Sequence, residues 1–325
     1  MIAPATTEAI DRAAQLLRAG ALVAFPTETV YGLGADARNP DALHRLYAVK
    51  GRPGEHPVIV HIAKASSAAQ WASRMPTFAQ TLAQAFWPGP LTLILPCAQG
   101  VPPLVTGGQD SIGLRVPAHP VAQALLARFA EQGGNGIAAP SANRFGRISA
   151  TLATHVADEF GADVALILDG GACEHGIEST IVDCTGDAPA VLRPGAIGLE
   201  QLTRVLGRVP HSVHADAPRA SGSLELHYAP RTPSRLLARD DLVWQLARLP
   251  AARVAVLAHS IPRPAAFPGM WCAGPPRSAD YAHTLYANLR LLDASGSDEI
   301  WIEAPPQHEE WAAINDRLRR ATHRP

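Results

Sequence analysis

The sequence has little cysteine, few aromatic residues and no excess of either charge. Its four cysteines, Cys97, Cys173, Cys184 and Cys272, are spread along 325 residues with no C-x-x-C pair. We therefore expect reduced, buried thiols rather than a disulfide framework. Aromatic residues make up 6%, and 28 Lys and Arg face 29 Asp and Glu, which argues against a protein that coats nucleic acid or an anionic membrane. A polyanionic ligand would need a local cluster of cations.

Long apolar runs and the common catalytic motifs are also missing. The longest largely apolar stretches, such as 91–95 and 164–168, fall far short of the ~20 residues that span a bilayer. The N-terminus lacks the basic start and apolar stretch of a signal peptide, so we expect a cytoplasmic protein. There is no phosphate-binding G-x-x-x-x-G-K-[ST] loop, no H-E-x-x-H and no G-x-S-x-G. Metal-ligating side chains, redox chemistry and an acyl-transfer serine are therefore not predicted.

The first two hundred residues alternate helical and strand patterns. Thr6 or Thr7 can cap a helix that ends at Gly20, and Asn39-Pro40 opens a second helix that ends at Lys50. Short apolar runs predict strands at 21–25, 57–62, 91–95, 112–116, 136–139, 164–168, 179–184 and 190–192. The predicted class is α/β, with a sheet covered on both faces.

The pattern changes after about residue 207. Residues 208–234 contain several prolines and no periodicity, which predicts a long and therefore functional linker. Beyond it the α/β pattern resumes, with strands at 253–259 and 299–303 and helices at 281–292 and 309–320. We expect three parts: a catalytic domain over 1–207, a linker or lid over 208–234, and a small α/β domain over 235–325.

Polar residues interrupt two of the predicted strands. His61 shares a strand face with Ile59, although a satisfied core histidine is the more common explanation of such a residue. The strand predicted at 112–116 has one polar side, which carries Ser111, Gly113 and Arg115. At ~3.3 Å per residue, about 13 Å separates Ser111 from Arg115. This side could line a long ligand, and an edge facing solvent would give the same pattern.

Several loops add cations and hydroxyls. Residues 26–34 follow a strand and are rich in threonine and glycine, so their backbone amides can face a ligand. Lys50 and Arg52 at a helix end form a cationic pair suited to phosphate. Another polar loop runs from Ser141 to Ser149. Together these features predict a cleft that binds a nucleotide and a small anion, with catalysis by positioning and charge stabilisation.

The order of these motifs resembles the threonylcarbamoyl-AMP synthase family, in its longer form with a YrdC-like domain and a small C-terminal domain. The segments that carry the resemblance are 25–33, 50–53, 57–61, 87–92, 113–117, 140–143, 178–181 and 192–195, with 221–222, 227–230 and 313–318 typical of the longer form. The family's paired motifs, K-x-R and S-x-N, are met by Lys50, Arg52, Ser141 and Asn143.

The resemblance implies a YrdC-like twisted open sheet with flanking helices, followed by a linker and a smaller Rossmann-like α/β domain. It also implies a reaction of L-threonine, bicarbonate and ATP, with magnesium accompanying ATP, that gives threonylcarbamoyl-AMP and pyrophosphate. The product would pass to a tRNA threonylcarbamoyl transferase, without a membrane and with little or no direct tRNA binding.

The resemblance assigns roles to individual residues. The implied catalytic residues are Lys50, Arg52, Ser141 and Asn143. The implied ATP-binding residues are Arg52, His56, Ser111, Ser141, Ser149 and Arg193. The implied threonine-binding residues are Thr29, His61, Arg115, Ala139 and Ser179. In the linker, Leu224, Leu226, His227 and Tyr228 are too apolar and aromatic for a free spacer, and we expect His227 and Tyr228 to form a lid.

Two positions depart from the family pattern, and two other functions compete. Ala150 stands where proline is usual and Phe145 where a small residue is common, whereas His56, where asparagine is frequent, keeps a donor for the nucleotide. One alternative is an RNA-binding module acting on tRNA or ribosomes, which the charge balance does not favour. The other is a carbamoyl-transfer protein with a YrdC-like core, which the linker and terminal domain argue against.

Overall fold

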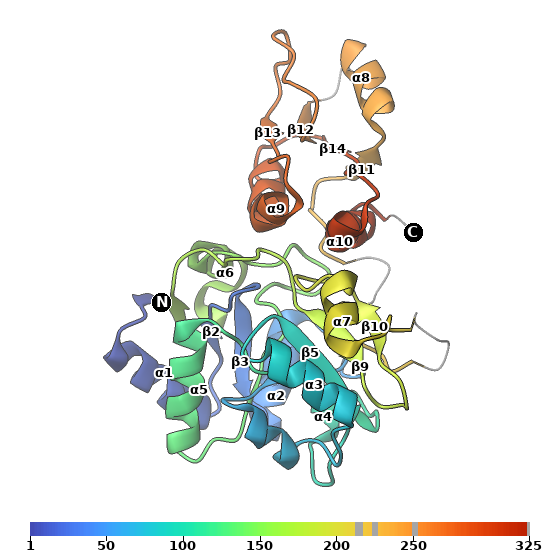
Figure 1. Cartoon of the computed structure of the whole chain (residues 1–325). Helices are drawn as coiled ribbons and strands as arrows, with labels where there is room; N and C mark the ends of the chain where they lie inside the picture. The colour runs from blue at the N-terminus through green and yellow to red at the C-terminus, as the bar shows by residue number, and fades with distance from the viewer. Residues whose placement is uncertain (212–216, 223–226, 249–252, 324–325) are drawn as a thin grey trace. The chain divides into compact units, whose positions relative to one another are not determined.

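The chain forms two compact units in a computed structural model that describes residues 1–211, 217–222, 227–248 and 253–323 (Figure 1). The N-terminal unit comprises Met1–Phe145, Ala150–Glu174 and Glu178–Ser223, and the C-terminal unit comprises Gly146–Ser149, His175–Ile177 and Leu224–Pro325. Two short segments from within residues 1–207 thus belong to the C-terminal unit. Leu224 and Leu226, which we expected in the lid, lie outside the described residues.

A ten-stranded mixed sheet, ordered β1-β8-β2-β3-β7-β4-β6-β5-β9-β10, forms the centre of the N-terminal unit. Its strands are β1 (Ile2–Pro4), β2 (Val23–Phe25), β3 (Gly32–Asp36), β4 (Ile59–His61), β5 (Leu91–Pro96), β6 (Ser111–Arg115), β7 (Ile137–Ala138), β8 (Leu166–Asp169), β9 (Thr180–Asp183) and β10 (Ala190–Arg193). The predicted α/β class is confirmed.

Local signals place the first two helices of this unit. The Thr6 side chain accepts a hydrogen bond from the Ala9 amide at the start of α1, and Asn39 caps α2 in the same way. Gly51 ends α2 in the left-handed conformation that glycine adopts without strain. The helices are α1 (Thr7–Arg18), α2 (Pro40–Lys50), α3 (Thr77–Phe86), α4 (Pro103–Thr106), α5 (Pro120–Glu131), α6 (Ala153–Phe160) and α7 (Leu199–Leu206), with 3-10 turns at Ala65–Gln70 and Gly161–Asp163.

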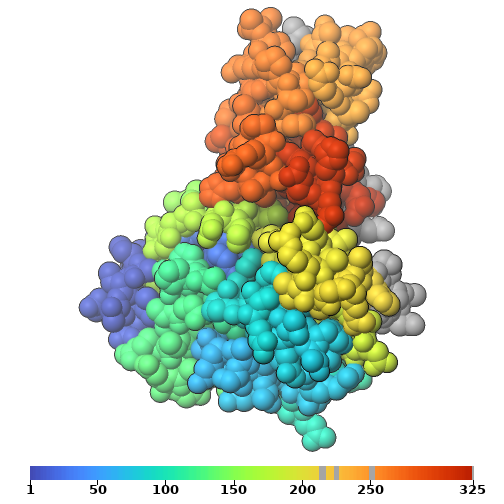
Figure 2. Space-filling model, viewed as in Figure 1, coloured from blue at the N-terminus to red at the C-terminus, as the bar shows by residue number. Residues whose placement is uncertain are grey.

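One face of the sheet packs against five helices. Alternate residues of the central strands, such as Val60, Leu93 and Leu114, join a large apolar core with residues of α2, α3, α4, α6 and α7. In this layer α3 and α7 lie side by side (Figures 1 and 2). This face holds the largest apolar cluster of the unit, and its burial stabilises the central strands.

The other face carries the polar residues. Ile137 of β7 pairs with His61 of β4, and His61 pairs with Arg115 of β6, so the three residues share a face. We call it the α5 face, because over strands β8, β2 and β7 it packs against α1 and α5 through residues such as Leu17, Phe25 and Phe129. We refer to this part, from β1 to β7, as the covered half.

The remaining strands, β4, β6, β5, β9 and β10, form the open half of the α5 face. Its buried apolar cluster consists of Ile59, Ile94, Ile181 and Ala220, with Leu192 packed against them. None of these five residues belongs to a helix. The expectation of a sheet covered by helices on both faces is therefore wrong for this half in the described part of the chain, where a linker residue, Ala220, takes the helix's place.

Strand β3 was not expected, because its glycine-rich sequence lacks apolar periodicity. It pairs antiparallel with β2 and β7. A Cβ atom on Gly34 would lie 2.9 Å from side-chain atoms of both Ile137 and Phe25. The glycines therefore let the rings and methyl groups of the covered half close over β3, and residues 26–31 alone form the loop that we expected over 26–34.

The C-terminal unit is built on a four-stranded parallel sheet ordered β11-β14-β12-β13. Its strands are β11 (Ser234–Leu237), β12 (Val254–Ala258), β13 (Trp271–Ala273) and β14 (Glu299–Glu303); its helices are α8 (Arg239–Ala247), α9 (Ser278–Asp293) and α10 (Ala312–Thr322), with a 3-10 turn at Glu309–Trp311. This agrees with the predicted small α/β domain. Among the described residues of the whole chain, no helix has the length and hydropathy to cross a membrane.

Candidate active site

Arg115 is the centre of the polar cluster on the α5 face. It is 4% exposed at the end of β6, a central strand, which excludes the solvent-edge interpretation. Its Nη1 donates to Thr29 Oγ1 at 2.8 Å, its Nη2 to Glu28 Oε1 at 2.6 Å and its Nε to the Gly89 carbonyl at 3.2 Å. A guanidinium has five N–H groups, so two remain beyond these three contacts, the number that a carboxylate accepts in a bidentate pair.

Glu28 is the acidic partner of Arg115 and is 3% exposed. Its second oxygen, Oε2, accepts the backbone amides of Ala118 at 3.0 Å and His119 at 3.4 Å. Burial alone would raise the pKa of this carboxyl group, but the Arg115 charge and the hydrogen bonds outweigh burial and hold the pKa below its ordinary value. Glu28 is therefore ionised at neutral pH.

His61 lies beside Arg115 in the strand register and is 3% exposed. Burial, followed by the nearby Arg115 charge, lowers its pKa to about 3, so the ring is neutral at physiological pH. Its Nδ1 has no hydrogen-bond partner among the described residues. The edge of the ring meets Phe25 at a centroid distance of 6.1 Å. A buried and unsatisfied ring nitrogen beside an arginine is suited to contact a polar ligand.

A second cluster surrounds Ser179 just before β9. The Ser179 and Thr92 hydroxyls are 2.8 Å apart, and Arg193 Nη2 donates to the Ser179 carbonyl at 2.8 Å. Leu93 pairs with Leu114, so the register places Thr92 next to Arg115. Ala139 donates its amide to the Ile59 carbonyl at 3.0 Å, on the other side of β4. The structure thus places the five predicted threonine-binding residues on neighbouring strands and loops of the N-terminal unit.

Two further arginines meet over the open half. Arg52 Nη2 donates to the Pro57 carbonyl at 2.7 Å and to Ser221 Oγ at 3.3 Å, and Arg193 Nη1 donates to the Ser221 carbonyl at 2.8 Å. Both arginines are less than 9% exposed. Two buried cations that share one serine form a strongly anion-attracting site. His56 borders it, with its ring 5.4 Å from that of Phe145.

Lys50 joins the K-x-R motif to the S-x-N motif. Its ammonium group donates to the Ser141 carbonyl at 2.6 Å and to the Asn143 carbonyl. The side chain is buried, and burial, followed by the Arg52 charge, lowers the pKa of Lys50 well below its ordinary value. Both contacts go to backbone carbonyls, so Lys50 holds the 141–143 loop in position. The two motifs that carry the family resemblance therefore meet in space.

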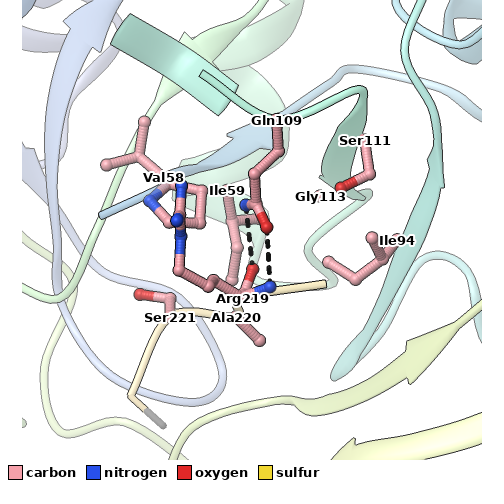
Figure 3. A pocket seen from close by; sticks show the side chains of 10 residues that line it. Val58, Ile59, Ile94, Gln109, Ser111, Gly113, Arg219, Ala220 and Ser221 are labelled. Atoms are coloured by element: carbon pink, nitrogen blue, oxygen red, sulfur yellow. Dashed lines mark hydrogen bonds between the residues drawn. The ribbon is translucent and has the colours of Figure 1, made fainter. Parts of the chain in front are cut away.

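The linker segment 219–221 lies over the open half, where Ala220 packs against the isoleucines and Arg219 lies beside Gln109 (Figure 3). Gln109 and Arg219 form two hydrogen bonds: the Arg219 amide donates to Gln109 Oε1 at 2.7 Å, and Gln109 Nε2 donates to the Arg219 carbonyl at 3.2 Å. The cavity beside Ser111 and Gly113 has a volume of about 10 Å³, which holds about one water molecule. A nucleotide at Ser111 therefore requires segment 219–221 to move.

Three predicted site residues belong to the C-terminal unit. The Ser149 carbonyl accepts a hydrogen bond from Arg290 Nε at 3.2 Å. Tyr228 is 1% exposed, stacks on Tyr286 at a centroid distance of 5.7 Å and has φ of 63°. The His227 ring lies 4.1 Å from that of Tyr228. Tyr228 is thus a packing residue of this unit, whatever else it does.

The sequence analysis missed several residues of the site. Glu28 lies within a quoted motif without an assigned role, and its acidic side chain in a threonine-rich loop was the available signal. Thr92 likewise followed a proline-glycine motif. Gln109 and Arg219 gave no signal, because their contact joins positions 110 residues apart. Among the described residues, no group of three or more His, Cys, Asp or Glu side chains could hold a metal ion.

The fold and the site are those of an α/β enzyme with a cluster of buried arginines that is suited to anionic substrates. Models of two families match the chain: one described as "Telomere recombination" over residues 15–195, and one described as "Threonylcarbamoyl-AMP synthase, C-terminal domain" over residues 197–322. The chain belongs to the threonylcarbamoyl-AMP synthase family.

Individual relatives agree with this membership. The chain is 38% identical to the threonylcarbamoyl-AMP synthase of Pyrococcus abyssi, over 95% of this chain and 93% of the relative. It is 34% identical to that of Schizosaccharomyces pombe, over 97% and 88%. The crystal structure of P. abyssi Sua5 complexed with L-threonine superposes with a TM-score of 0.89 at 35% identity, covering 99% of this chain and 96% of that chain.

Proposed function

We propose that this enzyme condenses L-threonine, bicarbonate and ATP to threonylcarbamoyl-AMP and pyrophosphate, and that the product serves to modify adenosine beside the anticodon of tRNA. The observation that carries the proposal is the set of three buried arginines: Arg115 and Arg193 lie on strands of the open half, and Arg52 shares Ser221 with Arg193. Membership of the family supports the same reaction.

The arginines compensate the charge that the reaction brings together. Threonine's amine takes up bicarbonate or CO2 as a carbamate, whose oxygen then attacks the α-phosphorus of ATP in line. ATP carries close to four negative charges, and the carbamate and the threonine carboxylate add two more. These charges repel strongly in a cleft of low dielectric unless cations compensate them. Arg52 and Arg193 would face the phosphates, where charge develops in the transition state.

The two substrates would divide the α5 face between them. Threonine would lie at Thr29, His61, Arg115, Ala139 and Ser179, with its carboxylate on the two remaining N–H groups of Arg115. The neutral His61 can accept a hydrogen bond from the substrate through Nδ1. ATP would take Arg52, His56, Ser111, Ser141, Ser149 and Arg193, and Lys50 with Asn143 would fix the loop around it.

Magnesium would arrive with ATP as part of the substrate. Hydroxyls, amides and cations surround the arginines, and the acid that contacts Arg115, Glu28, already accepts hydrogen bonds from Arg115 and two backbone amides. This donor set suits an ion that the phosphates hold. The ion would neutralise phosphate charge and leave the arginines to position the reacting groups.

The linker would close over the bound substrates as a lid, with His227 and Tyr228 as its covering residues. Closure would exclude water from a mixed anhydride that hydrolyses easily. Proteolytic cleavage within residues 215–230 should then slow when ATP and threonine are added together. Unchanged cleavage with both ligands present would reduce the linker to a tether between domains 1–207 and 235–325.

The test of the reaction is pyrophosphate release that depends on threonine. Purified enzyme with ATP, magnesium, bicarbonate and threonine should release pyrophosphate, and omission of threonine or bicarbonate should stop the release. Valine in place of threonine should be much poorer, because it leaves hydroxyl-matched polar groups unpaired. Titrations with ATP, threonine and tRNA separate the alternatives: tight tRNA binding without threonine-dependent turnover would favour an RNA-binding module and contradict the proposal.

A further inference from the structure

Glu28 is a buried acid to which neither the family motif nor the proposed substrate contacts give a role. It stands between two threonines of the 26–31 loop, and Thr27 and Thr29 turn their hydroxyls to each other at 2.9 Å. The carboxylate spans two structures: Oε1 meets the Arg115 guanidinium, and Oε2 meets the amides of Ala118 and His119 at the start of α5. A buried ion pair needs such additional hydrogen bonds to offset the desolvation of its charges.

The charge of Glu28 works against anion binding. A negative charge 2.6 Å from Arg115 neutralises much of the field that would attract a substrate carboxylate. Its benefit must therefore be geometric. An arginine side chain has several rotatable bonds, and its guanidinium binds a carboxylate in two parallel bonds only when the planar fork is correctly aimed.

Three fixed contacts aim that fork. Gly89 holds Nε, Thr29 holds Nη1 and Glu28 holds Nη2. Of these three partners, Glu28 alone is charged, and it is anchored to the backbone amides of the α5 N-terminus, so its position does not depend on Arg115. We propose that Glu28 is a positioning residue that aims Arg115 at the carboxylate of the amino-acid substrate, an inference that rests on the proposed function.

Glutamine at this position provides a sharp test. The hydrogen bonds that the Glu28 carboxylate accepts from Arg115, Ala118 and His119 all come from N–H groups, and they involve both carboxylate oxygens. A glutamine amide has one oxygen and one NH2 group, so either orientation aims the NH2 at a donor. Glu28→Gln therefore loses the anchor on one side while it keeps the volume of the side chain.

The expected result is a selective loss of threonine affinity. In Glu28→Gln the KM for threonine should rise about tenfold to a hundredfold, as for the loss of a charged hydrogen bond, whereas kcat at saturating threonine and the KM for ATP should stay within about threefold. Glu131→Gln is the matched control, because Glu131 is exposed and pairs with Arg128 on the outer surface. It should leave all three constants unchanged.

Two further variants and one substrate analogue isolate the route through Arg115. Glu28→Asp keeps the charge but is one methylene shorter, so we expect a smaller rise in the KM for threonine than in Glu28→Gln. This variant also keeps the inference testable if Glu28→Gln does not fold. L-Threoninamide lacks the carboxylate, so its KM should not change in Glu28→Gln. In an Arg115→Met background, Glu28→Gln should add no further loss.

Other outcomes overturn the inference. A collapse of kcat at saturating threonine with KM unchanged would mean that Glu28 itself handles a proton. Equal rises in the KM values for threonine and ATP, or for threonine and threoninamide, would mean that Glu28 has only a general structural role. Unchanged kinetic constants would mean that Glu28 has no role in the reaction. Failure of the proposed reaction is distinguishable, because the unmodified enzyme would then release no threonine-dependent pyrophosphate.

Discussion

The two halves of the α5 face differ in what covers them. Over the covered half, α1 and α5 bury Phe25, Ile137 and the β8 leucines in a continuous apolar cluster. Over the open half, a single linker alanine rests on three isoleucines, and Arg115, Arg193 and Arg52 border them. Strand β4 pairs with β7 on one side and with β6 on the other, so the sheet is continuous across the border between the two halves.

This difference shows how one sheet serves stability and binding at once. The covered half contributes apolar burial, whose value scales with the area removed from water. In the described part of the chain no helix residue belongs to the apolar cluster of the open half, so only segment 219–221 would have to move to admit a ligand beside Gly113. A Cβ atom on Gly113 itself would lie 3.2 Å from Ile94 and 3.4 Å from Ile59, so a side chain there would crowd the floor of the half. Substitutions in the two halves should therefore have different signatures.

The largest effect is expected in the covered half. Phe129 is 1% exposed in α5, and Phe129→Ala should lower the free energy of unfolding by about 3–5 kcal/mol, because it opens a cavity that the helix cannot fill. The KM values for ATP and threonine should not change at a temperature at which the variant is folded. Urea unfolding and steady-state kinetics check both parts. A large rise in either KM with an unchanged free energy of unfolding would contradict the division of stability and binding between the two halves.

The next effect is expected in the open half and in activity. Arg52→Ala should reduce kcat/KM for ATP about tenfold to a hundredfold, equivalent to ~1.5–3 kcal/mol for a contact to a charged group. Its melting temperature should fall less than that of Phe129→Ala. Arg204→Ala, at an arginine that is exposed on α7, is the control. Near-normal turnover in Arg52→Ala would contradict the proposal that the phosphates of ATP bind in the open half.

We expect acid to lower the free energy of unfolding through His61, which lies where the two halves of the face meet. The unfolded histidine titrates near pH 6.5, whereas the pKa of the folded one is about 3. Between these values the unfolded chain binds the extra proton, so stability falls as the pH falls, by up to about 1.4 kcal/mol per pH unit. Urea unfolding from about pH 7 to about pH 5 should give a shallower slope in His61→Gln. Identical slopes in the two proteins would show that His61 is not buried as a neutral group.

The smallest effect is expected at Gln109. It holds Arg219 by two hydrogen bonds, each worth about 0.5–1.5 kcal/mol, and so keeps Ser221 on Arg52 and Arg193. Gln109→Ala should loosen segment 219–221 and lower the KM for ATP by about twofold to tenfold, without a change in the KM for threonine. The control is Gln80→Ala. Gln80 lies in α3, and its side-chain amide donates to the Met75 carbonyl. A higher KM for ATP in Gln109→Ala would mean that segment 219–221 helps ATP to bind more than it competes with ATP for the two arginines.

The sequence predicted the parts of the fold that local signals determine. The caps at Thr6 and Asn39, the α/β class and the shared side of Ser111, Gly113 and Arg115 follow from spacing alone. Strand β3 escaped prediction because glycine carries no hydrophobic pattern. Strands β1 and β13, of three residues each, were also not predicted.

The site was predictable mainly where motifs recur in the family. Lys50, Ser141 and Asn143 carry such motifs, and the structure brings them into contact. The hydrogen bonds of Gln109 with Arg219, and the grouping of Ser149 with the C-terminal unit, depend on contacts between segments far apart in the sequence. Strand order has the same origin, because it is set by which distant segments pack together.

The position of Ser221 on two buried arginines has a consequence for the time course of nucleotide binding. If ATP binds Arg52 and Arg193 as we propose, it cannot reach them in one collision, since Ser221 must first leave them. The observed rate of association should therefore rise with ATP concentration at first and then level off at the rate at which the linker opens. A stopped-flow trace with a fluorescent ATP analogue would show this plateau, and its height would measure how often the resting enzyme exposes its arginines.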